Sequence, residues 1–136
     1  MKPIVMEFLG EQCEFNLTGD RAWAAEQEVG PIIQGMKNRL NEIGVLKALV
    51  YYGLGGEKAG ITKEDVGMLS PGEMLHVWGP AIEAFYNNEP FEVVQARRAR
   101  MKERAEREIE AGLSNLLAAT IEGATRGLVA PKDAAK

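Results

Sequence analysis

The chain has 136 residues, which suffices for one domain with a moderate core, and its 46% hydrophobic and 26% charged residues are typical of an ordinary globular protein. No run approaches the roughly 18 apolar residues that span a bilayer, and no apolar segment of the secretory type follows the N-terminus, so the sequence predicts a soluble, cytoplasmic protein. The net charge of −4 argues against a protein whose whole surface neutralises nucleic-acid phosphates.

The N-terminal segment alternates apolar and polar side chains on both sides of Gly10. This alternation is the period of a half-buried strand, and the glycine offers a turn. A β-hairpin is therefore predicted, with one face on helices, because two strands alone are marginally stable in water. Its apolar positions are Ile4, Met6, Phe8, Cys13, Phe15 and Leu17.

Two helices are predicted after the hairpin. Thr18 and the two residues after it supply N-cap chemistry for a short helix over residues 21–29, which Gly30 ends. Apolar residues spaced by three and four then predict a core helix over residues 32–52, although Gly44 could split it in two. The glycines of residues 53–56 mark its end.

The second half of the chain contains two further cap signals and a long periodic segment. Thr62 and Ser70 both begin capping-box patterns, and the helix after Ser70 should continue to residue 87, with Pro80 bending or breaking it. One long helix is predicted over residues 91–126. Its apolar stripe consists of Val94, Met101, Ala105, Ile109, Leu113, Leu116 and Ile121.

These elements predict a fold class and a domain plan. The fold is a mainly helical α+β single domain with an N-terminal β-hairpin and a long C-terminal helix. Residues 1–90 form the hairpin and helical core, residues 91–126 form a charged helix of the same domain, and residues 127–136 form a flexible tail.

The residues needed for catalysis or metal binding are scarce. His76 is the only histidine and Cys13 the only cysteine, so no histidine pair can hold a metal, and one thiol–imidazole dyad without any local signature remains. The glycines of residues 53–56 follow a helix instead of preceding one, which favours a helix stop over a phosphate loop. The sequence therefore predicts a protein that is not an enzyme and holds no cofactor or metal.

Charge is concentrated in one segment, residues 97–107, which we call the basic stretch. It holds six basic residues and two glutamates, a balance of +4 that leaves −8 for the rest of the chain. Ion pairs four residues apart, such as Glu103–Arg107 and Arg104–Glu108, favour a solvated helix face, whereas the cluster could also bind an acidic partner. By contrast, the predicted helix pair over residues 61–84 lacks the arginines and lysines expected of a DNA-recognition helix.

Candidate partner-binding residues come from the basic stretch and from the aromatic side chains. Aromatic residues at helical spacing usually belong to a core, but tryptophan and tyrosine are also common interface anchors. The candidates for partner binding are Arg97, Arg98, Arg100, Arg104, Trp78 and Tyr86.

The order of several short segments resembles a known family. A hairpin leads to Leu17-Thr18, then to Ala24-Ala25-Glu26-Gln27-Glu28-Val29-Gly30, to an apolar helix that ends at Gly53-Leu54, and to a Thr-x-Glu-Asp-Val segment over residues 62–66. This order is similar to that of the small tail assembly chaperones of tailed phages and of phage-derived gene transfer agents. The resemblance covers residues 4–86.

The resemblance implies a non-enzymatic protein of the host-cell cytoplasm that coats the tape-measure protein and helps deliver tail-tube subunits during virion morphogenesis. It also leaves homo-oligomerisation open, and it assigns no binding residue. The alternative function is a nucleic-acid-binding or packaging accessory protein that uses the basic stretch.

Overall fold

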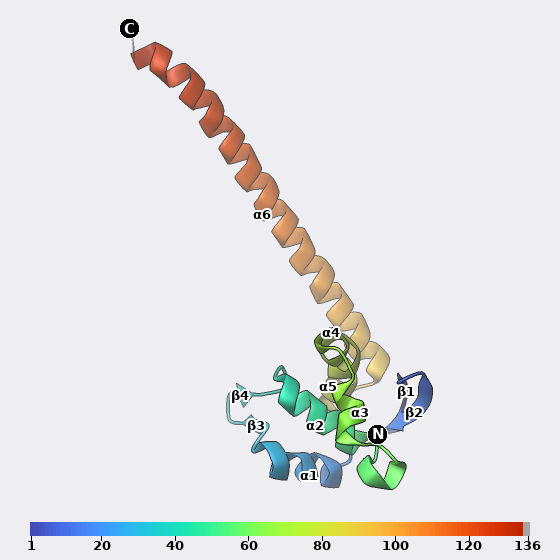
Figure 1. Cartoon of the computed structure of the whole chain (residues 1–136). Coiled ribbons are helices and arrows are strands. Elements are labelled where there is room, and N and C mark those ends of the chain that lie inside the picture. Colours follow the sequence, from blue (N-terminus) through green and yellow to red (C-terminus); the bar gives the residue numbers. More distant parts are fainter. Residues whose placement is uncertain (135–136) are drawn as a thin grey trace. The chain divides into compact units, whose positions relative to one another are not determined.

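The computed structural model describes the backbone of residues 1–134 and the side chains of residues 1–119 (Figure 1). It confirms the predicted fold class, a mainly helical α+β protein with an N-terminal antiparallel hairpin and a long C-terminal helix. The chain divides into two compact units, Met1–Ala96 and Arg97–Lys136.

The predicted hairpin is present as strands β1 (Ile4–Phe8) and β2 (Glu11–Phe15), paired in the register Ile4↔Phe15 and Phe8↔Glu11. Leu9 and Gly10 form the two-residue turn, with φ of 49° and 84°. Positive φ at both central positions matches the turn that best suits the twist of antiparallel strands. The inward-facing side chains Ile4, Met6, Phe8, Phe15 and Leu17 are buried as the alternation predicts.

Helix α1 (Gly19–Val29) follows and confirms the predicted cap. The Thr18 hydroxyl accepts a hydrogen bond from the backbone N–H of Arg21 at 3.3 Å. Gly30 ends the helix with a φ of 84°, a left-handed value that glycine adopts at little cost.

The predicted helix over residues 32–52 is wrong in its first part. Residues in that part form a second small hairpin, β3 (Ile33–Gln34) and β4 (Lys37–Asn38), and helix α2 begins only at Ile43 and ends at Gly53. Gly35, with a φ of 59°, lies at the turn, where the favoured hairpin geometries require a positive φ. Gly44 lies in the first turn of α2 and splits nothing.

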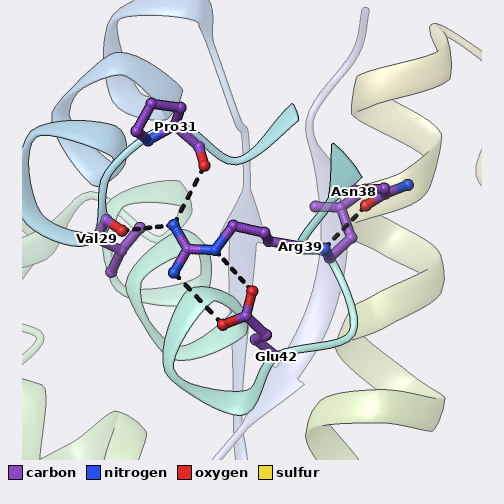
Figure 2. A network of polar contacts seen from close by, with 6 residues as sticks. Val29, Pro31, Asn38, Arg39 and Glu42 are labelled. Carbon is purple, nitrogen blue, oxygen red and sulfur yellow. Dashed lines mark hydrogen bonds and ion pairs between the residues drawn. The ribbon is translucent and has the colours of Figure 1, made fainter. Parts of the chain in front are cut away.

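Arg39 explains why the chain turns before α2. Its guanidinium donates to the backbone carbonyls of Val29 and Pro31 at 2.7 and 3.2 Å, and its Nε donates to the carboxylate of Glu42 at 2.6 Å (Figure 2). The hydrogen bond to Glu42 raises the pKa of Arg39. These bonds hold the segment between α1 and α2 in a shape that a continuous helix could not adopt.

The core lies around α2, whose Val45, Leu46, Leu49 and Val50 are buried, and α2 packs against α1. Gly53 allows the close approach of the hairpin, because a Cβ built there would lie 2.2 Å from the Phe15 ring. The Arg21 guanidinium joins the same region by donating to the carbonyls of Asn16 and Gly53 at 2.9 and 3.0 Å.

The segments after α2 are a short 3-10 helix, η1 (Gly56–Ala59), and α3 (Lys63–Gly67), which begins with the predicted capping box of Thr62 and Asp65. The helix after Ser70 extends as far as predicted, but in three parts. These are α4 (Pro71–Glu73), the π-helical turn η2 (Met74–Trp78) and α5 (Gly79–Asn87).

Pro80 accounts for the π-helical turn. A proline inside a regular α-helix would clash with the carbonyl four residues earlier and leave it without a donor. In η2 the backbone N–H of Gly79 instead donates to the carbonyl of Met74, five residues back. The hydrogen bonding of the helix therefore shifts by one residue before Pro80, and the proline does not break the helix. Single π turns of this kind are known to interrupt the regular hydrogen bonding of α-helices.

We expect Ser70→Ala to destabilise the protein by about 0.5–2 kcal/mol, because the Ser70 hydroxyl accepts the backbone N–H of Glu73 at 3.1 Å at this helix start. Urea denaturation followed by circular dichroism would measure the change. Ser114→Ala, at an exposed position inside a helix, is the control, and no loss of stability is expected there. Equal midpoints for the two variants would show that the cap contributes nothing.

Helix α6 (Phe91–Ala134) confirms the predicted long helix. It continues beyond residue 126, where the sequence predicted its end, so residues 127–134 of the predicted tail are helical, and residues 135 and 136 lie outside the described residues. Extending a formed helix requires no new nucleation, which explains why the weaker helix formers near its end do not stop it. The boundary between the two compact units falls inside this helix, after Ala96.

Candidate partner-binding surfaces

Trp78 was predicted as a partner-binding anchor, and the structure contradicts this. Its side chain is 1% exposed, and its ring lies edge-on to Phe8 and Phe15, with centroid separations of 6.0 and 5.6 Å. The hairpin covers the π-helical turn on which Trp78 lies. Trp78 is therefore a core residue, as aromatic residues at helical spacing usually are.

Tyr86, the second aromatic candidate, is half-buried near the end of α5. Its hydroxyl oxygen is fully buried, with no hydrogen-bond partner among the described residues. Burial, together with the nearby carboxylate of Glu26, raises the pKa of Tyr86 to about 12. The ring contributes to packing, but its buried hydroxyl is not presented to a partner on this surface.

Tyr86→Phe should stabilise the protein by about 1 kcal/mol, since it removes a buried hydroxyl that has lost its hydrogen bonds to water and gained no partner.

The raised pKa of Tyr86 also makes the stability of the parent protein fall at high pH. The unfolded chain ionises this phenol near pH 10, whereas the folded protein keeps it protonated to about pH 12. The parent should therefore lose stability relative to Tyr86→Phe as the pH rises from 10 to 12. Thermal unfolding at pH 7, 10 and 11 would reveal both effects, and a less stable variant at pH 7 would contradict them.

The basic stretch lies on α6. Arg100 and Arg104 are exposed, and Arg97 and Arg98 are partly exposed. Two of the predicted ion pairs are present, Arg104–Glu108 at 3.4 Å and Arg107–Glu103 at 3.8 Å. Exposed pairs of this kind contribute little to stability. The four arginines named from the sequence therefore lie on one accessible helix, in the unit that begins at Arg97. The two aromatic candidates belong to the other unit.

The same segment of α6 carries an exposed apolar stripe. Every side chain from residue 99 to residue 119 is exposed, although apolar residues recur there every three or four positions. The sequence contained this signal, but helical spacing indicates only that residues share a face, not what covers the face. The large members of the stripe and its edge are Met101, Ile109, Leu113, Leu116 and Leu117, which are 55–63% exposed.

Trp23 is an exposed aromatic side chain outside the set of partner-binding candidates named from the sequence. It lies on α1 and is 64% exposed, whereas Ala25, two residues further along the helix, is fully buried. Tryptophan is enriched among the residues that dominate binding energy at protein interfaces. Its position on the outer face of α1 could be recognised only once the buried face of that helix was known.

A groove of about 210 Å³ lies between α1, α2 and α3. Lys63 pairs with Glu28 at its rim and lies over the Tyr51 ring, 5.8 Å from the centroid. The hydrogen bond to Glu28 raises the pKa of Lys63. Lys63 is therefore already paired within the chain, and Lys47 is a second basic residue that lines the groove.

The structure does not bring together Cys13 and His76, the two residues considered for a catalytic dyad. Cys13 is half-buried, and it lines a depression that also includes Arg21 and Leu54. His76 is exposed on the π-helical turn. Within the described part of the chain no hydrogen bond joins them, and no group of three or more histidine, cysteine or acidic side chains is placed to hold a metal ion.

Among the described residues, no helix is both long enough and apolar enough to cross a membrane. Comparisons with protein-family models, with curated proteins and with solved structures gave no match.

Proposed function

We propose that this protein is a tail assembly chaperone of the phage or gene-transfer-agent type, which binds tape-measure and tail-tube proteins during tail morphogenesis and performs no catalysis. The observation that carries the proposal is the segment of α6 after Ala96, where basic and apolar side chains are exposed together on one helix. The order of short sequence motifs over residues 4–86 supports it independently.

The chemistry of this helix suits an elongated protein partner. Apolar side chains supply most of the affinity at a protein interface, whereas charges set the association rate and the register. The basic stretch carries +4 in a chain whose remaining residues carry −8, so it can attract acidic surfaces of a partner. A helix that exposes both features along its length can lie against an extended partner.

We expect the combined change Arg97→Glu, Arg100→Glu and Arg104→Glu to reduce recovery of the tape-measure and tube proteins about tenfold without unfolding the chain. The partners would be the products of the neighbouring tail genes, co-expressed with the tagged chain and recovered by pull-down. Lys2→Glu, Lys37→Glu and Lys58→Glu, at exposed positions in the other unit, form a control with the same change in charge. Circular dichroism would check the fold of both variants.

The alternative function, nucleic-acid binding, rests on the same basic stretch. The salt dependence of DNA binding distinguishes it from the chaperone function. If four of its basic residues contacted phosphates, the affinity for duplex DNA would fall with a slope of about −3.6 in a plot of log K against log salt. Tight binding of duplex DNA by the parent at physiological salt, together with unchanged pull-down by the arginine variant, would replace the chaperone proposal with this one.

A further inference from the structure

We propose that the segment of α6 over residues 97–119 pairs in parallel with the same segment of a second copy of this chain. This inference does not depend on the proposed function: it assigns the central apolar stripe to a second copy and leaves the arginines on the far side of the helix, Arg100 and Arg107, to other partners. It starts from the exposed apolar stripe, whose central members are Met101, Ala105, Ile109, Leu113 and Leu116. A long helix that exposes such a stripe in water is stabilised when another surface covers it.

The stripe forms one continuous face. Successive residues of an α-helix are rotated by about 100°, so the five central members fall within about 60° on either side of a line through Leu116. Their separations of four, four, four and three residues are closer to an 11-residue repeat than to a heptad. A pair built on this face would therefore be nearly straight or slightly right-handed.

The charges on the two flanks of the face indicate which molecule covers it. On one flank lie Glu106, Glu110 and Glu103, about 80–140° from the centre line. On the other flank lie Arg97 and Arg104, about 100–120° from it, together with Glu108, which pairs with Arg104. One edge of the stripe is thus acidic and the opposite edge is mainly basic.

This asymmetry favours a parallel pair of identical helices. In a parallel two-fold pair, the acidic flank of each helix faces the basic flank of the other. In an antiparallel pair each flank would face its own copy, so glutamates would face glutamates and arginines would face arginines. A second copy in parallel orientation thus satisfies both the apolar face and its two charged edges.

Two charged side chains of the segment lie within the central arc, Arg98 on the centre line and Lys102 about 40° from it. Polar groups in such a seam fix register and orientation at some cost in affinity. The long side chain of Lys102 can carry the ammonium outward from the seam, toward the acidic flank beside it, and Arg98 lies one turn before Met101, at the end of the apolar face. The face from Met101 to Leu116 is only about 22 Å long, so we expect a dissociation constant in the micromolar range.

Sedimentation equilibrium of the full chain between about 5 and 300 µM would test the pairing. The parent should pass from monomer to dimer, and Leu113→Ser with Leu116→Ser should weaken the dimer at least about a hundredfold. The matched control, Ala111→Ser with Ala118→Ser, changes the far side of the same helix and should dimerise as the parent does. A parent that stays monomeric, or equal dimers in all three proteins, would overturn the proposal.

The serine substitutions could weaken the dimer by lowering the helix content, so a second variant tests the pairing without lowering helix propensity. Glu106→Lys with Glu110→Lys keeps residues of high helix propensity and makes both flanks basic, so it should weaken the dimer about tenfold while circular dichroism remains unchanged. If it dimerises as tightly as the parent, the charge argument fails.

Cysteine cross-linking tests the orientation. In a Cys13→Ser background, Ala105→Cys lies about 20° from the centre line of the face, in the N-terminal half of the segment, and Ala111→Cys lies on the far side. A parallel pair brings the two copies of residue 105 within disulfide distance, so mild oxidation should give a covalent dimer for Ala105→Cys and about tenfold less for Ala111→Cys. Dimers that sediment together but do not cross-link through residue 105 would overturn the parallel arrangement.

Discussion

Gly53→Ala should destabilise the protein by about 3 kcal/mol, at the upper end of the usual cost of overpacking a core. The added methyl would lie 2.2 Å from the nearest carbon of the Phe15 ring, well inside van der Waals contact. That ring is fully buried and is held edge-on by Trp78 and Phe85, with centroids 5.6 and 5.5 Å away, so it cannot move aside freely. The gain of about 1 kcal/mol in helix propensity from glycine to alanine is smaller than the clash.

Gly44→Ala is a matched control for this variant in the same helix. A Cβ at Gly44 meets no atom within 4 Å, so the substitution should stabilise the protein by about 0.5–1 kcal/mol. Guanidinium denaturation followed by circular dichroism would compare the two variants. If Gly53→Ala were as stable as the parent, the hairpin and α2 would not be in the close contact described above.

Trp78→Ala should cost about 3–5 kcal/mol, the range found for removing a fully buried aromatic side chain. The loss includes the two edge-on ring contacts to Phe8 and Phe15, through which the hairpin is attached to the helical core. This loss is a large part of the 5–15 kcal/mol that stabilises a typical domain. We therefore expect a fall in the melting temperature that differential scanning calorimetry would resolve easily.

Trp23→Ala gives the corresponding control, because it removes the same side chain from a position that is 64% exposed. Its effect on stability should stay within about 0.5 kcal/mol. Equal destabilisation by the two substitutions would contradict the assignment of Trp78 to the core and of Trp23 to the surface.

The parts of the fold that follow from local chemistry were predictable. Alternation around Gly10 indicated the hairpin, and the hydroxyl residues Thr18, Thr62 and Ser70 marked three helix starts that the structure confirms. In each case the signal and the structure it produces lie within a few residues of each other. Such signals need no knowledge of how distant elements pack.

The errors occur where distant contacts decide the structure. Apolar residues at 33, 36 and 40 had helical spacing, but Ile33 and Met36 are exposed, and Arg39 reaches back to carbonyls at the end of α1. The hydrogen bonds that outweigh the helical pattern there depend on the folded positions of α1 and α2, which the local sequence does not encode.

The candidate surfaces were predictable only in part, because they too depend on contacts between distant elements. The arginines of the basic stretch could be named from their density alone, and they lie on an accessible helix. Trp78 and Trp23 both lie in segments that the sequence predicts to be helical, yet one is buried and the other exposed. Which of them faces the core depends on which face of each helix the hairpin and α2 cover, and that is a property of the assembled fold.

The two arginine contacts at the ends of α1 imply that this helix opens cooperatively. Arg21, in its first turn, binds the carbonyl of Gly53 at the end of α2, while Arg39, just before α2, binds the carbonyl of Val29 at the end of α1. Neither end of α1 can therefore fray without breaking a bond to α2 or to the segment just before it. In amide hydrogen exchange, the two helices should consequently behave as a single foldon with similar protection, and the first turn of α1 should not exchange ahead of its middle.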